Sequence, residues 1–395
     1  MSNRRVLVLN HFAVPRGEPG GTRHVELFGR LQGWDATIIA SSLNFTTGKK
    51  QAPRPGFVPV PVIPYRSNGP FRIANWISFA VAATWASFRQ PRPDVVYGSS
   101  PHLLAGLAAW FVARARHARF VLEIRDLWPR VLVEMGQMAE TSRVYRLLQA
   151  LERFLYRQAD SIVVLATGSA DVLRGLGVPD DKIVYIPNGA DPEDFVPSAA
   201  REALRARYGF GCLTFIYAGA HGPANGLDLL LDAAAETEGD YEVVLVGAGV
   251  EKERLVKRVA DGNLPRVRFM EPVPKTEMAD LLAAADVGVH VLADVALFSY
   301  GVSPNKVYDY MAAKLPVLTN SAGLVSDLVE RVGAGIAVES RSISTGLRRF
   351  AAMDNDHLMT LGGAGSRWLT ANQSRSAMAI RLMDLLDQSI KRTHG

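Results

Sequence analysis

Short apolar segments alternate with helix-length segments through both halves of this chain. Apolar runs of about four to eight residues between helical segments are typical of strands buried on both faces, as in parallel sheets. We therefore predict an α/β chain with two doubly wound, Rossmann-like parallel sheets. Residues 44–70, polar and Pro-rich, form either a lid or a detour with a short strand at 57–63. The other predicted strands are 6–9, 36–40, 94–97, 119–124, 161–165 and 183–186, then 213–217, 243–246, 266–270, 287–291, 315–318 and 336–338.

The length of the chain, 395 residues, favours two domains. Single hydrophobic cores stop growing at roughly 250–300 residues. The sequence PNGADP at 187–192 interrupts the alternation of strands and helices and marks the boundary. We predict a first domain at 1–190, a second at 191–370 and a terminal helix at 371–395. A long helix expected at 367–390 would be able to return to the first domain.

Charge is divided unevenly between the two halves. Residues 1–190 hold 23 Lys and Arg against 13 Asp and Glu, whereas residues 191–395 hold 21 against 26. A basic half favours a polyanionic surface, and we expect an anionic membrane and no nucleic acid; compositional drift is the alternative. The single cysteine, Cys212, precludes an internal disulfide, and the basic start with its short apolar run indicates a first strand and no signal peptide. Both features predict a cytoplasmic protein.

The segment 71–88, FRIANWISFAVAATWASF, is strongly apolar. It is too short and too often interrupted by polar residues to span a bilayer, which needs about 20 apolar residues. Trp76 and Trp85, flanked by Arg72 and Arg89, suit a helix that lies at a membrane interface. The alternative is a domain helix that packs its aromatic side inward, and the two roles are compatible. We predict peripheral association with the inner face of the cytoplasmic membrane.

Three polar segments of the first half follow predicted strands. They are the pair Gly20-Gly21, the stretch from Ser99 to His102, and Arg125-Asp126. Ligands of parallel sheets collect beyond the carboxyl ends of the strands, so these segments are expected along one edge. Glycines before a helix let the backbone approach phosphate closely. Each segment also has a structural alternative: a plain turn for Gly20-Gly21, a loop histidine for His102 and a structural ion pair for Arg125-Asp126.

Four further strand-end loops lie in the second half, at 219–226, 247–249, 271–274 and 299–309. The first two are rich in glycine and suit close approach of a phosphate or a ring. In the fourth, Pro304 is expected in the first turn of a helix, which places Lys306 and Asp309 on one face near its positive end. A cation for phosphate beside a carboxylate for hydroxyls suits a sugar nucleotide; an ordinary surface ion pair is the alternative. No P-loop, metal-ligand spacing or GxSxG motif is present, so no metal is expected.

Four motifs together resemble the large family-four group of retaining nucleotide-sugar glycosyltransferases of the GT-B fold. They are GG at 20–21, NGxD at 188–191, the strand followed by GxG at 246–249, and SPNKVYDYMAAKLPVL at 303–318. RDLWP at 125–129 is similar to a subgroup that assembles bacterial polysaccharides such as the O-antigen of lipopolysaccharide, including N-acetylfucosamine transferases. The resemblance runs over nearly the whole chain.

The resemblance implies two domains facing across a cleft, with acceptor bound by the first and a UDP-sugar by the second. The transferred sugar would be an N-acetylated hexosamine or deoxyhexosamine, and the acceptor a lipid-linked or other saccharide, with no cofactor. Asp309 would bind ribose hydroxyls and Glu271 to Val273 would lie against the base. Lys306, Asp309, Arg125 and Asp126 are the candidate catalytic residues, and His102, Arg72, Trp76, Trp85 and Arg89 would lie on the acceptor or membrane side. The candidate donor-binding residues are Gly20, Gly21, Gly219, His221, Gly222, Asn225, Gly247, Glu271, Pro272, Val273, Ser303, Pro304, Asn305 and Tyr308.

Three positions depart from the family pattern. Ala220 and Asn225 stand where the family carries an Arg and a Lys, and Gly301 stands where it carries a glutamate. Lys306, the start of its helix and His221 are the available substitutes for binding the departing diphosphate. Two alternatives follow from these losses: a sugar-nucleotide-binding subunit without turnover, and a nucleotide-sugar 2-epimerase of the same fold.

Overall fold

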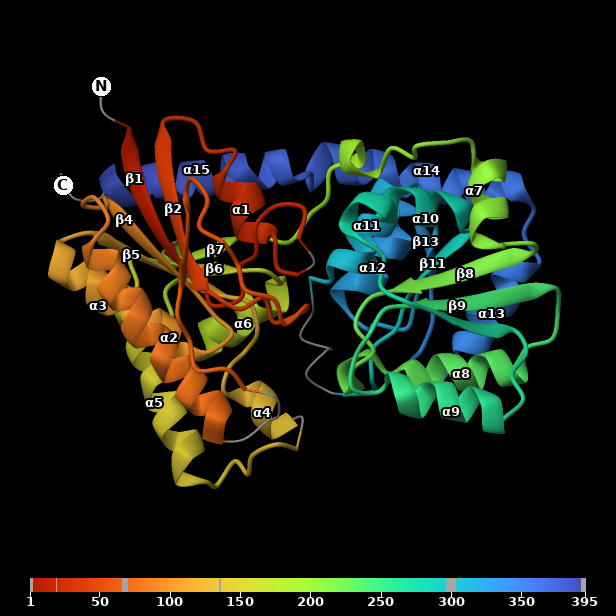
Figure 1. The fold of residues 1–395 in the computed structure, drawn as a ribbon, viewed down its shortest axis with the longest axis horizontal. Coiled ribbons are helices and arrows are strands. Elements are labelled where there is room, and N and C mark those ends of the chain that lie inside the picture. The colour runs from red at the N-terminus through yellow and green to blue at the C-terminus, as the bar shows by residue number, and fades with distance from the viewer. Residues whose placement is uncertain (1–2, 19, 66–69, 135, 296–302, 392–395) are drawn as a thin grey trace. The chain divides into compact units, whose positions relative to one another are not determined.

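The computed structural model of the chain describes residues 3–18, 20–65, 70–134, 136–295 and 303–391 (Figure 1). The start of the expected donor segment, 299–302 with Gly301, lies outside the described residues. The chain divides into two compact units, the first formed by Met1–Pro187 with Ser376–Gly395 and the second by Asn188–Arg375.

The first unit contains a seven-stranded sheet in the order β3-β2-β1-β4-β5-β6-β7, with all neighbouring strands parallel. The order reverses between β1 and β4, and the carboxyl ends of these two strands form the switch point where ligands of such sheets bind. The strands are β1 (Arg4–Leu9), β2 (Trp34–Ser41), β3 (Phe57–Val60), β4 (Val95–Ser99), β5 (Arg119–Ile124), β6 (Ser161–Val164) and β7 (Ile183–Tyr185), and the helices are α1 (Arg23–Phe28), α2 (Pro70–Phe88), α3 (Leu103–Arg116), α4 (Arg130–Glu134), α5 (Arg143–Gln158), α6 (Thr167–Gly175) and α15 (Arg375–Lys391).

Both faces of this sheet are covered by helices, which explains why its strands are apolar without alternation. Val121 belongs to a core that α1 and α15 close from one side, with Met378 and Leu382 contributed by α15. The next residue, Leu122, packs on the other face, where its side chain meets Gly106 of α3. Figure 1 shows α2, α3 and α5 on that side of the strands.

The second unit contains a six-stranded sheet in the order β10-β9-β8-β11-β12-β13, again parallel throughout. Its switch point lies between β8 and β11. The two Rossmann-like parallel sheets predicted from the alternation are therefore confirmed. The strands are β8 (Leu213–Ala218), β9 (Tyr241–Val246), β10 (Val267–Met270), β11 (Val287–His290), β12 (Val317–Thr319) and β13 (Gly335–Ala337), and the helices are α7 (Arg201–Tyr208), α8 (Leu227–Glu236), α9 (Lys252–Asp261), α10 (Met278–Ala284), α11 (Asn305–Ala312), α12 (Leu324–Val332), α13 (Ile343–Ala351) and α14 (Asn355–Asn372).

The single terminal helix expected at 367–390 is wrong, because the chain breaks it into α14 and α15 at Gln373 and Ser374. Gln373 leaves the helical conformation (φ −146°, ψ 27°), and its side-chain amide donates to the Asn188 carbonyl oxygen at 2.7 Å. The Gln373 N–H keeps the last helical hydrogen bond, to the Leu369 carbonyl at 2.8 Å, and the side chain adds this buried tertiary one. Local helix propensity could not predict this break, because it depends on a contact with a residue 185 positions away in the sequence.

The NGxD motif at 188–191 has a structural role in the same contact. A Cβ on Gly189 would overlap the Gln373 carbonyl oxygen, so the close approach of the two segments requires glycine. The Asp191 carboxylate accepts from the Arg375 backbone N–H at 2.8 Å. The two segments where the chain passes between the units are therefore joined here by the backbone of the motif and by its Asp191 side chain.

Candidate functional site

Two Gly-rich loops of the second unit are in backbone contact at the carboxyl ends of β8 and β9. The His221 N–H donates to the Ala248 carbonyl at 2.8 Å. Gly247 has φ +149°, and a Cβ there would overlap the Gly219 carbonyl oxygen. Glycine at 247 is therefore needed for the approach of the two loops to each other, whereas the sequence pattern suggested the approach of a ligand.

Lys306 extends from the start of α11 over Gly219 at the end of β8. A Cβ on Gly219 would overlap Lys306 Cε and lie 3.0 Å from its Nζ. Nζ donates to Asn225 Oδ1 at 3.1 Å and lies 5.0 Å from the centroid of the Tyr217 ring. Asn225, one of the positions that lacks the family's basic residue, therefore positions the lysine that remains. Pro304 precedes α11 as its N-cap in extended conformation, so the expectation that it occupies the first helical turn is wrong.

Burial lowers the pKa of Lys306 to about 8, against the opposing attraction of Asp309 on the same helix. An ammonium group that has lost hydration gains by binding an anion, because the anion restores the interactions that water had supplied. The α11 N-terminus adds a favourable dipole. The site is therefore suited to a phosphate group.

Two buried histidines lie near Lys306, which contributes to lowering the pKa of each ring. Burial is the main cause and lowers the pKa of His221 to about 4 and of His290 to about 3, so both rings are neutral near pH 7. Neither ring nitrogen of His221, nor Nε2 of His290, has a hydrogen-bond partner among the described residues. His290 Nδ1 lies 3.0 Å from Thr319 Oγ1. Sequence reasoning missed His290, whose signal was a lone histidine at the end of a buried strand.

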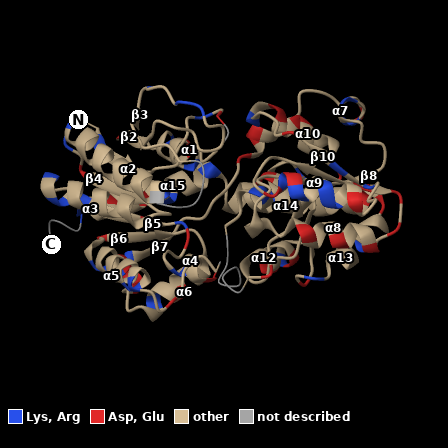
Figure 2. Cartoon of the chain, turned by 60° about the horizontal axis from the view of Figure 1, so that its bottom comes forward, with Lys and Arg blue, Asp and Glu red and all other residues tan. Residues whose placement is uncertain are grey.

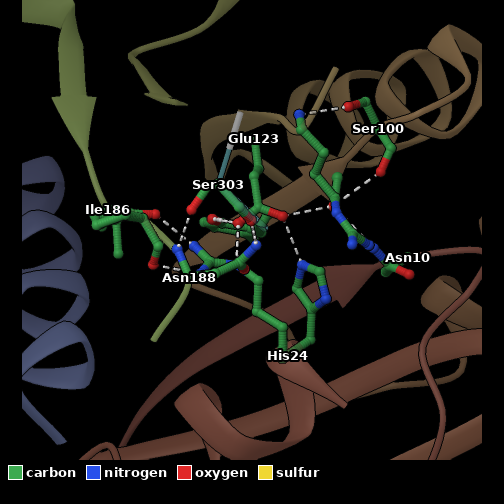
Figure 3. A network of polar contacts seen from close by, with 12 residues as sticks. Asn10, His24, Ser100, Glu123, Ile186, Asn188 and Ser303 are labelled. Atoms are coloured by element: carbon green, nitrogen blue, oxygen red, sulfur yellow. Dashed lines mark hydrogen bonds and ion pairs between the residues drawn. The ribbon is translucent and has the colours of Figure 1, made fainter. Parts of the chain in front are cut away.

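The remaining predicted residues around α11 differ in their surroundings. Ser303 is tied to the NGxD motif, since its hydroxyl accepts from the Asn188 N–H at 2.9 Å and its carbonyl from the Asn188 side chain at 2.5 Å (Figure 3). Tyr308 is buried and its hydroxyl lies 3.5 Å from Ser303 Oγ, while Asn305 is exposed. The linker motif therefore positions the residue that leads into the Lys306 helix.

The predicted base-binding segment, 271–273, lies at the end of β10. The Glu271 side chain is mostly exposed and pairs with Lys252 Nζ at 2.8 Å. The same ammonium donates to the Gly247 carbonyl at 2.9 Å, so Lys252 links the Gly-rich loop to this segment. Pro272 is exposed and Val273 packs partly against the core. Gly222 lies at an open position, where an added Cβ would have only Asn225 Nδ2 near it, at 4.0 Å.

In the first unit, Glu123 at the end of β5 is the centre of a buried polar network (Figure 3). Its carboxylate accepts from Arg23 Nε at 3.1 Å and from His24 Nε2, the Tyr97 hydroxyl and the Ser99 hydroxyl at 2.8 Å each. Burial acts to raise the pKa of Glu123, but Arg23 and His24 outweigh it and hold that pKa well below its usual range. The carboxylate is therefore ionised near neutral pH. Sequence reasoning missed this residue.

Arg23 connects this network to residues 186 and 187, where the chain leaves the first unit for the second. Its guanidinium donates to the carbonyl oxygens of Ile186 and Pro187, each at 2.7 Å. These are the last residues before Asn188. The network thus fixes the direction in which the chain leaves the sheet.

The predicted segments of the first unit occupy the strand ends as expected. The Arg125 N–H donates to the Ser100 hydroxyl at 2.8 Å, which joins two of them, and Asp126 is exposed. In the Gly20-Gly21 pair, the Gly21 carbonyl accepts from the Val14 N–H at 3.2 Å and Gly20 has φ +132°. The pair therefore folds its loop back on itself.

His102 is buried at the start of α3 and caps that helix through Nδ1, which accepts from the Ala105 N–H at 3.2 Å. Its neutral ring therefore carries the proton on Nε2, which lies 2.7 Å from His11 Nδ1. Trp76 stacks on the His102 ring with centroids 5.3 Å apart. The cap, the hydrogen bond and the stacking together give His102 a structural explanation.

No group of three or more His, Cys, Asp or Glu side chains in the described part of the chain is placed to hold a metal ion.

Comparison with known proteins identifies the class of the chain. HepE of Anabaena, solved in complex with UDP and glucose, superposes with a TM-score of 0.72 at 16% identity, covering 98% of this chain and 100% of that chain. At this identity the likeness shows the shared fold of two Rossmann-like domains. Residues 26–189 match the glycosyl transferase 4-like domain, and residues 212–351 match glycosyl transferases group 1. The chain therefore belongs to the glycosyltransferases of the GT-B fold class.

Curated relatives agree on this class. A probable glycosyltransferase of Pseudomonas aeruginosa, WbjE, is 27% identical over 68% of this chain and 67% of its own length. A GDP-mannose-dependent α-(1-6)-phosphatidylinositol monomannoside mannosyltransferase of Mycobacterium tuberculosis is 28% identical over 53% of this chain. The chain spans a little over half of the latter, 56% of its length.

Proposed function

We propose that the protein transfers a sugar from a nucleotide sugar to a lipid-linked or other saccharide acceptor in cell-surface polysaccharide biosynthesis. The observation that carries this proposal is the Lys306 ammonium, held over Gly219 at the switch point of the second unit. It lies at a helix start and beside two glycine loops at the carboxyl ends of their strands. This arrangement suits the diphosphate of a sugar nucleotide.

The proposed chemistry is the departure of a nucleoside diphosphate from the anomeric carbon, with retention of configuration and without a metal. An acceptor hydroxyl oxygen bonds to the anomeric carbon as the bond from that carbon to the phosphate oxygen breaks, and the hydroxyl proton passes to the departing diphosphate. Negative charge grows on the diphosphate as its bond breaks. A preorganised ammonium stabilises that charge more in the transition state than in the bound donor, which is what lowers a barrier. Lys306 supplies the ammonium, and the neutral rings of His221 and His290 are further hydrogen-bond donors in the same region. Asp309 is assigned to the ribose hydroxyls.

We further propose a UDP-sugar donor carrying an N-acetylated hexosamine or deoxyhexosamine. HepE, which shares the fold, binds UDP, whereas the mycobacterial relative is dependent on GDP-mannose. The nucleotide therefore has to be tested directly. A panel of UDP-N-acetylglucosamine, UDP-glucose and GDP-mannose, each with and without a bacterial membrane lipid extract, would be assayed for release of the nucleoside diphosphate.

We expect release that depends on the extract, highest for UDP-N-acetylglucosamine, and abolished in Lys306→Met. Lys257→Met, which neutralises an exposed lysine of α9, is the matched control and should leave release unchanged. No release with any donor would contradict the proposal. Binding of UDP with turnover only after a partner chain is added would identify a binding subunit, which the loss of basic residues at Ala220 and Asn225 favours. Formation of an epimer without extract would identify an epimerase.

A further inference from the structure

Helix α2 presents an apolar stripe to solvent although its opposite side is buried in the first unit. Ile73, Ile77, Val81 and Trp85 are 54%, 50%, 66% and 63% exposed. Their spacing of four residues places them along one side of the helix. Phe79, on the other side, is completely buried. The helix is therefore apolar on both sides, whereas a surface helix normally carries polar residues on its outer side.

The stripe borders an apolar depression on the same surface. The depression has a volume of about 590 Å³ and is lined by Ile63 and by residues of α2 from Ala74 to Trp85. Phe111 of α3 is also half exposed, at 50%. Contiguous exposed apolar surface of this kind marks a binding surface for a protein or a membrane. The charges around it decide between these two.

Positive charge dominates the sequence on both sides of the stripe, and negative charge is nearly absent there. Residues 36–122 contain ten Lys and Arg against one acidic residue, Asp94. The Arg89 guanidinium lies 2.8 Å from the centroid of the Trp85 ring, and Arg116 lies 5.7 Å from that of Phe88. In Figure 2 the ribbon of α2 is tan for most of its length, whereas α9 carries both charge colours.

A helix end explains part of this charge, since cations near a C-terminus are favoured by the helix dipole. The dipole does not account for the lack of acidic residues over the many preceding positions, nor for the exposed tryptophan. Tryptophan and arginine beside an aliphatic stripe are the composition of helices that lie at the surface of anionic bilayers. A protein interface is typically surrounded by a polar rim, which does not require an excess of basic residues.

We propose that α2 docks the protein on an anionic lipid bilayer, with the stripe from Ile73 to Trp85 at the level of the acyl chains and the arginines at the phosphate groups. The helix would lie along the interface. Within the described residues, no helix is long and apolar enough to cross a membrane. The proposal stands independently of the transfer reaction, because it rests on this surface alone.

Vesicle flotation tests the proposal with the full chain. Wild-type protein should float with vesicles of phosphatidylglycerol and phosphatidylcholine and stay largely unbound with pure phosphatidylcholine. High salt should weaken binding, because exposed charges are screened. The double variant Ile77→Glu, Val81→Glu should lose binding at least about tenfold, since carboxylates are disfavoured among acyl chains. Val250→Glu, at a valine that is 85% exposed in the second unit, is the matched control and should bind like wild type.

A second variant tests the electrostatic part. Arg89→Gln with Arg92→Gln should weaken binding to anionic vesicles about 25-fold, at about fivefold per arginine, which corresponds to about 1 kcal/mol for each basic side chain near the surface. Unchanged thermal melting would show that the exposed substitutions leave the fold intact. Equal binding to neutral and anionic vesicles, no binding at all, or binding unaffected by the Glu variants would overturn the proposal. Light scattering that shows a wild-type dimer and a monomeric Glu variant, without vesicle binding, would assign the stripe to a second copy of the chain.

Discussion

Replacing Lys306 with methionine should stabilise the second unit and should also abolish its binding of a nucleoside diphosphate. The pKa of Lys306 falls from 10.5 to about 8 on folding, mainly through burial. One pKa unit corresponds to about 1.36 kcal/mol, so holding the charge in the ligand-free site costs at most about 3 kcal/mol. The side chain keeps some exposed surface, and solvent reduces this figure. Lys306→Met, which keeps the volume, should therefore raise the free energy of unfolding by about 1–3 kcal/mol.

The gain should depend on pH in a defined direction. Below pH 8 the lysine is protonated in both the folded and the unfolded state, so the full penalty is present in wild type. Between about pH 8 and 10.5 the folded state releases its proton first, and the wild type gains stability. The difference between variant and wild type should therefore be largest at about pH 7 and shrink toward about pH 10.

Thermal denaturation monitored by calorimetry measures this difference. One kcal/mol shifts the melting temperature of a unit of this size by about 2–4 °C, so a rise of roughly 2–12 °C is expected at pH 7. A nucleoside diphosphate at a hundredfold excess over its Kd adds about 2.7 kcal/mol to wild type and should add little to Lys306→Met. Lys257→Met should behave as wild type in both respects. A destabilised Lys306→Met that still responds to ligand would refute the reasoning.

Four further substitutions test contacts in the two units, each followed by urea denaturation. Gly247→Ala should lower the free energy of unfolding by about 3 kcal/mol or more, because its Cβ would overlap a backbone carbonyl, whereas Gly222→Ala, at an open position of the neighbouring loop, should change it by less than about 0.5 kcal/mol. Asn188→Ala should cost about 1–3 kcal/mol by leaving the partly buried Ser303 carbonyl without its donor. Glu123→Gln should cost about 3–5 kcal/mol, since it leaves the buried Arg23 guanidinium uncompensated. Equal effects of the two glycine variants, or neutral effects at Asn188 or Glu123, would contradict these assignments.

The sheets could be predicted from the sequence because parallel strands are buried on both faces. Residues 119–124, RFVLEI, show the limit of that signal. The apolar run located β5, but the pattern could not show that Glu123 within it is paired with Arg23 and His24, which lie about a hundred residues away. A carboxylate at the end of an otherwise apolar strand was the available sign. Its partners depend on register, which local sequence does not determine.

Helix α2 shows a different limit. The apolar composition of 71–88 predicted a helix, and its bounds agree closely with Pro70–Phe88. Apolar residues on every side, however, do not reveal which side packs inward. Phe79 packs into the domain core, as the domain-helix alternative expects, whereas Trp85 is exposed, as the membrane-interface alternative expects. The structure therefore combines the two.

In the second unit the sequence placed Lys306 and the Gly219 loop among the ligand-binding elements. It could not show that Asn225 positions the lysine or that burial lowers its pKa, because both depend on how α11 packs against the end of β8. The roles of these residues toward a donor stay predictions. Their juxtaposition is a property of the fold.

Proton uptake on nucleotide binding tests the central claim most directly. Near pH 8 the Lys306 amine is about half protonated in the free protein. An adjacent diphosphate would raise the pKa of this amine. UDP itself does not titrate there, since a terminal phosphate has its second pKa near about 6. Isothermal titration in two buffers of different ionisation enthalpy should therefore show uptake of about half a proton per UDP bound to wild type. Lys306→Met should show weak binding or none, without uptake. Tight binding of UDP with no proton uptake, unchanged in Lys306→Met, would contradict the assignment of Lys306 to the diphosphate.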